Sequence, residues 1–314
     1  MSRKVLLQLV LPLIGLSVLF WLLAFAPGDK HHQPALLEMS VILRDGDGNV
    51  SAMRKGMEQA AKDLNVELRF LTPAEDNSAV EQVQLLEHEV SGAAPAILLI
   101  PADREALGEA VSAAAGKTTL VTVESDMTAW GADASISMDH QALGEALGKA
   151  ALNGVSFGGT VLLLDSLLGD NGVRERMEAA KALLEEKGRQ VRIYRWTSDS
   201  TAFANILRIE RPKAVIAFEA AALTEMAELS RGEEAFPLLY GSGSTAGIAA
   251  ALEKGRVTAI AAVNVFSAGY LAVEAAAKLA RHESWTGASS VGFSIVRQET
   301  MYSSDNQKLL FPVT

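Results

Sequence analysis

The sequence contains no cysteine, and this absence excludes several kinds of protein at once. A chain without thiols has no disulfide, no thiolate zinc site and no cysteine nucleophile. Lipid attachment at a processed N-terminal cysteine is excluded as well.

An excess of positive charge is also missing. The formal net charge is −10, and the first 26 residues contribute two positive charges, Arg3 and Lys4, so the remainder carries −12. A body this acidic repels phosphate backbones. We therefore expect no nucleic-acid partner.

The N-terminus consists of a long uncharged segment behind Arg3 and Lys4. Val5–Ala26 holds 22 residues without a charge, enough for a helix to cross a hydrocarbon core of ~30 Å. A cleaved signal peptide is the alternative, because Ala24-Phe25-Ala26 resembles a cleavage site, but its apolar core would be unusually long. We expect 1–26 to be a membrane anchor or signal sequence. The positive-inside rule then places the body outside the cytoplasm, behind a tether over 27–36.

Short apolar segments alternate with longer segments of helical spacing from Leu37 onward, the first of these being Ser51–Leu64. The alternation predicts an α/β fold with parallel sheets covered on both faces by helices. Ten strands in two groups of five favour two doubly wound lobes, and a closed eight-stranded barrel is the alternative. The predicted strands are Leu37–Leu43, Val66–Leu71, Ala96–Ile100, Thr118–Val123, Ser135–Met138, Thr160–Leu164, Gln190–Tyr194, Ala214–Ala217, Pro237–Tyr240 and Thr258–Ala262.

Patterns typical of calcium and nucleotide sites fail on inspection. The segment after the first strand, Asp45-Gly-Asp-Gly-Asn49, resembles the start of an EF-hand loop, but the required Gly and Glu positions hold Val50 and Gly56. No G-x-x-x-x-G-K-[ST] sequence occurs in the chain. We expect no metal site and no cofactor.

Patterns typical of enzymes also fail. Gly154-Val-Ser156-Phe-Gly158 matches G-x-S-x-G, yet a nucleophile elbow needs a strand before the serine, and here a helix precedes it. His140, beside Asp139, is the histidine that follows a predicted strand, but no nucleophile accompanies it. We expect no catalysis, and a hydrolase or lyase using Asp139 and His140 stays as a less favoured alternative.

Polar residues gather where predicted strands end. Ligands of open α/β sheets sit at the carboxyl ends of the strands, so these residues form a candidate site for a small polar molecule. They are Asp47, Asn49, Glu124, Ser125, Asp126, Asp139, His140, Arg176, Glu219 and Ser242.

From about Leu37 onward, the chain resembles the type I periplasmic substrate-binding proteins of the ribose and galactose class, which serve ABC transporters. The order and spacing of five segments carry this resemblance: Val41–Met57, Ala96–Ala102, Leu120–Asp126, Val173–Leu184 and Gly269–Leu279. The resemblance implies two lobes that close on a ligand by hinge motion. It also implies lobe 1 over 37–138 and 265–284, and lobe 2 over 139–264 and 285–314.

The resemblance also implies which residues bind the ligand. The family's polar residue of the first loop falls on Asp47, and its aromatic pair falls on Asn49 and Val50. Its aspartate after the fourth strand is replaced by Glu124, beside Ser125, and its R-x-x-G-F arginine is Arg176.

Further family positions fall in the second half of the chain. Glu219 replaces an asparagine, Ser242 replaces an aspartate, and Asn264 stands beside the hinge position, Val263. Trp196 is the candidate for the aromatic wall of the second lobe.

These residues imply a ligand that is sugar-like, a polyol or an amino-bearing solute, because Asp47, Glu124 and Glu219 surround Arg176, the only cation among the candidates. We expect a monomeric, extracytoplasmic solute-binding protein that serves ABC permease subunits. An accessory protein for a membrane histidine kinase is the alternative.

Overall fold

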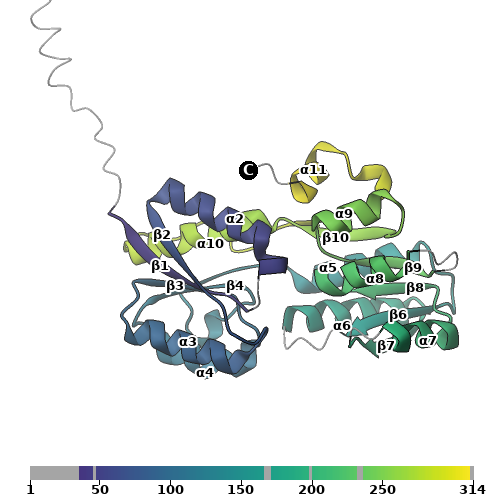
Figure 1. Cartoon of the computed structure of the whole chain (residues 1–314), viewed down its shortest axis with the longest axis horizontal. Helices are drawn as coiled ribbons and strands as arrows, with labels where there is room; N and C mark the ends of the chain where they lie inside the picture. Colours follow the sequence, from purple (N-terminus) through teal and green to yellow (C-terminus); the bar gives the residue numbers. More distant parts are fainter. Residues whose placement is uncertain (1–34, 45–46, 166–170, 198–199, 232–235, 312–314) are drawn as a thin grey trace, which may run out of the picture. The chain divides into compact units, whose positions relative to one another are not determined.

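The computed structural model describes residues 35–44, 47–165, 171–197, 200–231 and 236–311 of the 314. Their strands form two separate sheets (Figure 1). Two open sheets exclude the closed barrel, and the predicted α/β fold with two parallel-sheet lobes is confirmed.

Lobe 1 is built on a five-stranded sheet with strand order β2-β1-β3-β4-β5, in which all neighbours are parallel. Its strands are β1 (Leu37–Ile42), β2 (Val66–Leu71), β3 (Ala96–Leu99), β4 (Thr119–Glu124) and β5 (Ala134–Ser137). The helices packed on this sheet are α2 (Asp47–Leu64), α3 (Ala79–Ser91), α4 (Arg104–Ala114) and α10 (Val265–Ala280), and the short 3-10 helix η1 (Thr128–Trp130) precedes β5.

Two apolar layers cover the faces of this sheet. Met53 and Met57 of α2 pack with Val41 and Leu98 in one buried cluster, and α10 contributes to the same cluster. Side chains of α3 and α4 pack against the opposite face in a second cluster, around Leu99. Since both faces are covered, the strands are apolar at successive positions, as the sequence predicts for parallel sheets.

Lobe 2 is built on a six-stranded sheet with strand order β11-β10-β9-β8-β6-β7. Its strands are β6 (Thr160–Asp165), β7 (Gln190–Arg195), β8 (Ala214–Ala217), β9 (Leu238–Ser242), β10 (Ala259–Val263) and β11 (Phe293–Val296). Its helices are α5 (His140–Leu152), α6 (Asn171–Glu186), α7 (Ser200–Glu210), α8 (Ala220–Leu229), α9 (Ala246–Glu253) and α11 (Ser304–Leu310), with the 3-10 helix η2 (Gln298–Thr300).

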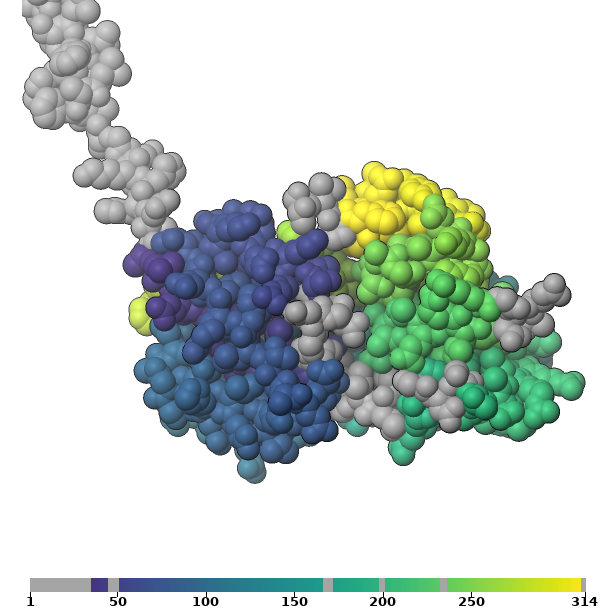
Figure 2. All heavy atoms as spheres, in the orientation of Figure 1, coloured from purple at the N-terminus to yellow at the C-terminus, as the bar shows by residue number. Residues whose placement is uncertain are grey.

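The last part of the chain adds two elements that the sequence analysis missed. β11 pairs with β10 and is antiparallel, so it does not continue the β-α alternation on which the strand prediction relied. α11 packs near β10, and in Figure 2 this C-terminal part (yellow) covers the surface beside the light green segment. Leu310 of α11 is buried in the apolar cluster of lobe 2.

Several helices begin at a residue whose side chain accepts a hydrogen bond from the first turn. Asp103 caps α4, Asp139 caps α5, Thr245 caps α9 and Asn264 caps α10. A capping side chain satisfies backbone N–H groups that have no partner within the helix. These caps fix the starts of helices directly after strand ends, where the candidate site residues lie.

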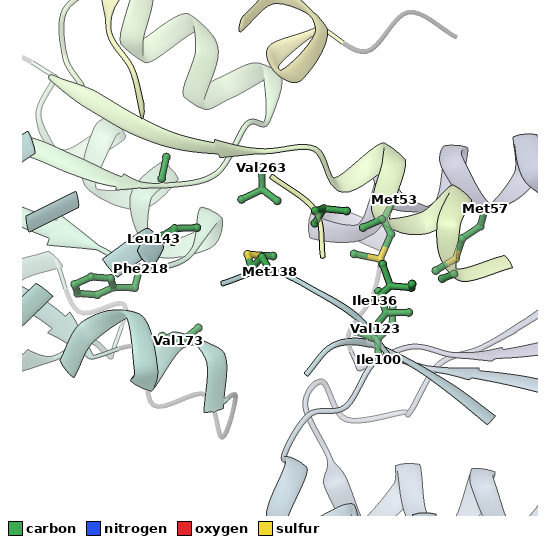
Figure 3. Close-up of a cluster of buried hydrophobic side chains, with 14 of the residues drawn as sticks. Met53, Met57, Ile100, Val123, Ile136, Met138, Leu143, Val173, Phe218 and Val263 are labelled. Carbon is green, nitrogen blue, oxygen red and sulfur yellow. The ribbon is translucent and has the colours of Figure 1, made fainter. Parts of the chain in front are cut away.

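The chain passes between the two sheets at three places, after β5, after β10 and after α10. The backbone of Ser137, at the first passage, is hydrogen-bonded to the segment of the third passage: its N–H donates to the carbonyl oxygen of Ser289, and its carbonyl oxygen accepts from the N–H of Val291. Figure 3 shows Met138 at the first passage, lying between side chains of lobe 1 and Phe218 and Val173 of lobe 2. The residue boundaries that the sequence analysis gives to the lobes stay a prediction.

The predicted anchor, Val5–Ala26, lies outside the described residues. Among the residues that the structure does describe, no helix is both long enough and apolar enough to cross a bilayer.

Helices α2 and α10 cross so closely that each needs a glycine at the contact. A Cβ on Gly56 would lie 2.0 Å from the carbonyl oxygen of Phe266, and one on Gly269 would lie 2.1 Å from the carbonyl oxygen of Met53. Neither oxygen belongs to a flexible side chain, so the helices themselves would have to separate.

We predict that Gly56→Ala and Gly269→Ala each lower the free energy of unfolding by about 1–3 kcal/mol, the usual cost of overpacking. Urea unfolding followed by circular dichroism measures this. Gly247→Ala in α9 is the matched control, because its nearest contact would be an ordinary 3.9 Å, and alanine there should be neutral or stabilising. Equal midpoints for all three variants would contradict the close crossing.

Candidate ligand-binding cleft

A cavity of about 300 Å³ opens between the carboxyl ends of strands from the two sheets; we call it the cleft. Lobe 1 contributes residues that follow β1 and end β4, and lobe 2 contributes residues from α6 and from the ends of β8 and β9. Val173, Val263 and Met138 give it an apolar part. Four of the predicted site residues line it: Glu124, Arg176, Glu219 and Ser242.

Glu124 ends β4 with a backbone that non-glycine residues seldom adopt, since its φ is 71°. Its carbonyl oxygen accepts hydrogen bonds from Ser137 Oγ at 2.5 Å and from His140 Nε2 at 2.9 Å. Its carboxylate forms an ion pair with Arg44 Nη1 at 2.9 Å. These contacts hold the left-handed turn and direct the carboxylate into the cleft.

Arg44 is a cleft residue that the sequence analysis missed. It follows β1 directly and is only 12% exposed at the side chain, against 15% for its partner Glu124. Lys55, on α2, also lines the cleft. The position of Arg44 directly after a buried strand was the available signal.

Arg176 is the only cation among the predicted site residues, but two cations that were not predicted also line the cleft. Among the described lining residues, Arg44, Lys55 and Arg176 are positive, whereas Glu124 and Glu219 are negative. The described part of the cleft is thus not acidic.

Arg176 is buried in the structure rather than lying on the exposed face of α6. It is 7% exposed and donates to the carbonyl oxygen of Phe218 at 2.9 Å, to His140 Nδ1 at 3.0 Å and to Met138 Sδ at 3.5 Å. The neighbouring glutamates of α6 contact other cations: Glu175 contacts Arg104 of lobe 1 at 3.4 Å, and Glu178 contacts Lys181 at 3.8 Å.

Glu219 and Ser242 occupy matching positions at the ends of neighbouring strands. Glu219 stands at the N-cap of α8, although its side chain makes no capping bond. Ser242 is the last residue of β9 and is 4% exposed. Both reach the cleft because the carboxyl ends of parallel strands meet at one edge of the sheet.

The other predicted residues whose side chains are described lie outside the cleft. Ser125, Asp126, Asp139 and His140 line a separate cavity of about 290 Å³. Asn264 caps α10: its side-chain oxygen accepts a hydrogen bond from the Ser267 amide at 3.0 Å.

Trp196 packs inside lobe 2 rather than forming a wall of the cleft. It is 7% exposed, and its ring meets Phe203 edge-on at a centroid distance of 5.3 Å. No aromatic side chain is among the described residues that line the cleft. Trp196 follows β7, the edge strand, which places it in the apolar cluster around α7.

Asp47 and Asn49 lie in the first turn of α2. Their side chains are outside the described part of the structure.

The side chains of Asp139 and His140, the less favoured catalytic candidates, form hydrogen bonds within the protein. Asp139 Oδ1 accepts from the Ala142 amide at 2.8 Å, and both ring nitrogens of His140 are hydrogen-bonded. No cluster of three acidic or histidine side chains able to hold a metal occurs among the described residues. The geometry suits the binding of a polar molecule.

Comparison with known proteins places the chain in a family. The model of the periplasmic binding protein domain matches residues 40–284. The chain therefore belongs to the periplasmic binding protein domain family, and the resemblance predicted from the sequence is confirmed. A search of curated proteins found no match.

Solved structures with the same fold include an ABC transporter solute-binding protein from Agrobacterium vitis with bound D-fucose. It is 20% identical, and the match covers 87% of this chain and 100% of that chain with a TM-score of 0.80. A carbohydrate transporter solute-binding protein from Agrobacterium radiobacter, in complex with D-arabinose, is 17% identical over 88% and 99%, with a TM-score of 0.81. A XylFII-LytSN complex is 17% identical over 85% and 99%, with a TM-score of 0.76. At these identities the likeness shows the fold.

We predict that Arg44→Gln and Glu124→Gln are coupled. Each substitution removes the ion pair of one partly buried charge, so each should cost about 1–3 kcal/mol of unfolding free energy, and the double variant should cost less than the sum. A thermodynamic cycle of urea unfolding measures the coupling, which we expect to exceed about 1 kcal/mol. The exposed pair Glu145–Lys149 is the control, with a coupling below about 0.5 kcal/mol. Equal couplings for the two pairs would contradict the role of Arg44.

Proposed function

We propose that this protein is an extracytoplasmic solute-binding protein that captures a small sugar-like or polyol ligand for an ABC importer. The observation that carries the proposal is the set of oriented polar groups at the carboxyl ends of both sheets, facing one cavity. Glu124 comes from lobe 1, whereas Arg176, Glu219 and Ser242 come from lobe 2. A ligand in contact with both sets would hold the lobes together.

The chemistry of the cleft favours hydroxyl groups. Carboxylate oxygens accept from hydroxyls, arginine and lysine N–H groups donate to them, and a serine hydroxyl does both. A volume of about 300 Å³ lies at the small end of ligand pockets, which suits one ring or a short polyol. Among the described lining residues, three positive side chains against two carboxylates make an amino group a weaker candidate than a hydroxyl.

The lack of aromatic rings among the described lining residues makes hydrogen bonding the main source of affinity. Stacking of a sugar ring on Trp196 is not part of the proposal, because that side chain packs against Phe203. Asp47 and Asn49 remain proposed ligand contacts at the start of α2. Ser125 and Asn264 are proposed to influence ligand binding indirectly, through the turns that follow β4 and β10.

The ligands of the related structures fit this chemistry. D-fucose and D-arabinose, carried by the two Agrobacterium proteins, are small polyhydroxylated molecules. We therefore propose free monosaccharides and polyols as the substrate class, with binding as a monomer and without chemical conversion.

A second candidate keeps the same capture step but delivers the signal to a membrane sensor. The XylFII-LytSN complex supports it, since that relative is solved with a protein partner. In this version the closed form is recognised by the sensor instead of a permease.

We also propose that Val5–Ala26 anchors the body to the membrane from outside the cytoplasm. The support is the length of this uncharged segment and the position of Arg3 and Lys4 before it.

A thermal-shift screen of the full chain, purified in detergent, tests the binding function. D-fucose, D-arabinose and myo-inositol are the first probes, and at least one small sugar or polyol should raise the melting temperature by mass action on the folded state. A flat response to the whole set of sugars and polyols would contradict the proposed class.

Arg176→Ala should weaken the binding of the responding solute about tenfold to a few hundredfold in calorimetric titration, because charge-assisted hydrogen bonds contribute about 1.5–3 kcal/mol each. It should also lower the melting temperature, since the buried carbonyl of Phe218 loses its donor. Arg176→Lys should restore only part of the affinity, because an ammonium lacks the guanidinium fork. The control is Arg208→Ala, which removes an exposed arginine of α7. Similar affinities for Arg176→Ala and Arg208→Ala would show that Arg176 does not serve the ligand.

The anchor predicts that the protein remains in the membrane fraction after a carbonate wash, with Val5–Ala26 still attached. N-terminal sequencing of the washed material measures this. Release of a protein that begins at Pro27 or Gly28 would refute the anchor in favour of a cleaved signal peptide.

A further inference from the structure

One imidazole joins the two halves of the cleft. His140 is the first residue of α5, two positions after Met138, and is 8% exposed. Its Nε2 lies 2.9 Å from the carbonyl oxygen of Glu124 in lobe 1, and its Nδ1 lies 3.0 Å from Nε of Arg176 in lobe 2. A single ring thus contacts Glu124, which lines the cleft from lobe 1, and Arg176, which lines it from lobe 2.

The two contacts define the protonation state of the ring. A carbonyl oxygen only accepts, so Nε2 carries the hydrogen. A guanidinium only donates, so Nδ1 is without one. Only the neutral Nε2–H form satisfies both partners.

We infer that His140 is a positioning residue for ligand capture: as the neutral Nε2–H tautomer it holds Arg176 and the turn at Glu124 in their binding positions. The inference rests on the proposed function, because it names the residue that orients that site. A proton added to Nδ1 removes the acceptor of Arg176 and sets two positive groups against each other. Protonation of Nδ1 therefore weakens capture.

The backbone at the start of α6 packs closely against the ring. A Cβ on Gly172, at the start of α6, would lie 2.5 Å from Cε1 of His140, so the backbone of α6 covers the ring closely. Two further acceptors of Arg176, the Phe218 carbonyl oxygen and Met138 Sδ, do not titrate.

Other charged groups line the small cavity beside the ring. Asp139 caps α5 through Ala142, Asp126 accepts from Thr128, and Glu175 contacts Arg104. The charged residues that line this cavity with His140 are Arg104, Asp126, Asp139 and Glu175. Each of the three carboxylates thus has a partner other than His140.

Two substitutions separate the contacts of the ring. His140→Asn keeps an oxygen near the place of Nδ1, as an acceptor for Arg176, and does not titrate. His140→Gln reaches toward the Glu124 carbonyl with its amide but has no acceptor at the place of Nδ1. His88→Asn removes an exposed histidine of α3 and is the matched control.

The binding experiment titrates the responding probe among D-fucose, D-arabinose and myo-inositol into the full chain at about pH 8 and about pH 5.5, on either side of the usual imidazole range. We expect the dissociation constant of the wild type and of His88→Asn to rise about tenfold or more on acidification. His140→Asn keeps the acceptor for Arg176 but loses the donor to Glu124, so at the higher pH it should bind more weakly than the wild type and more tightly than His140→Gln. Its dissociation constant should change less than about twofold at the lower pH. His140→Gln should bind about tenfold more weakly at both.

Two binding results would overturn the inference while leaving the proposed function intact. One is wild-type pH dependence in His140→Asn, and the other is wild-type affinity in His140→Gln.

A second measurement needs no solute and keeps the two proposals distinguishable. Long-range ¹H–¹⁵N correlation spectra of the histidine rings, assigned with His140→Asn, should show the Nε2–H tautomer at about pH 8 and a shift of the Arg176 Nε–H signal on acidification. A Nδ1–H tautomer, or an unmoved Arg176 signal, overturns the inference even if no probe binds. Failure of every probe to bind, with these spectra as expected, counts against the proposed function and supports the geometry.

Discussion

The carboxyl ends of both sheets face each other where the chain passes between the lobes. A buried apolar cluster around the three passages holds them in that arrangement. Met138, Val263 and Val291 lie on the three segments that pass between the sheets, and all three belong to one apolar cluster that includes residues of both lobes. Backbone bonds from Ser137 to Ser289 and Val291 tie the first passage to the third. Because these segments are short and bonded to each other, strand ends from the two lobes face one cavity. The cleft follows from this constraint.

Charged groups in such a cavity need partners, and their partners determine where they point. Arg44 and Glu124 form an ion pair within lobe 1, and Arg176 donates to His140 Nδ1 and to the Phe218 carbonyl oxygen in lobe 2. An unpartnered buried charge would cost several kcal/mol, so each of these contacts also stabilises the fold. The turn at Glu124 has a strained φ of 71° and is held by Ser137 and His140. Stability and binding geometry therefore depend on the same side chains.

The sequence predicted the ten parallel strands because a strand buried on both faces is apolar throughout, and this signal is local. It missed β11 and α11, since an antiparallel edge strand and a short terminal helix interrupt the alternation. It located Glu124, Arg176, Glu219 and Ser242 near the cleft, because ligands gather at strand ends. It assigned Trp196 to a cleft wall, although a residue at the end of an edge strand can turn into the core, as this one does.

The amino-acid sequence by itself determined the class of fold, the places where helices begin and the absence of thiol chemistry, because periodicity, capping residues and composition are properties of neighbouring residues. Only the tertiary structure decided which charges meet. Arg44 is paired with Glu124, 80 positions away, and His140 joins Glu124 to Arg176. Those contacts depend on the packing of separate elements, which fixes side chains to within a hydrogen bond. No local pattern carries that information.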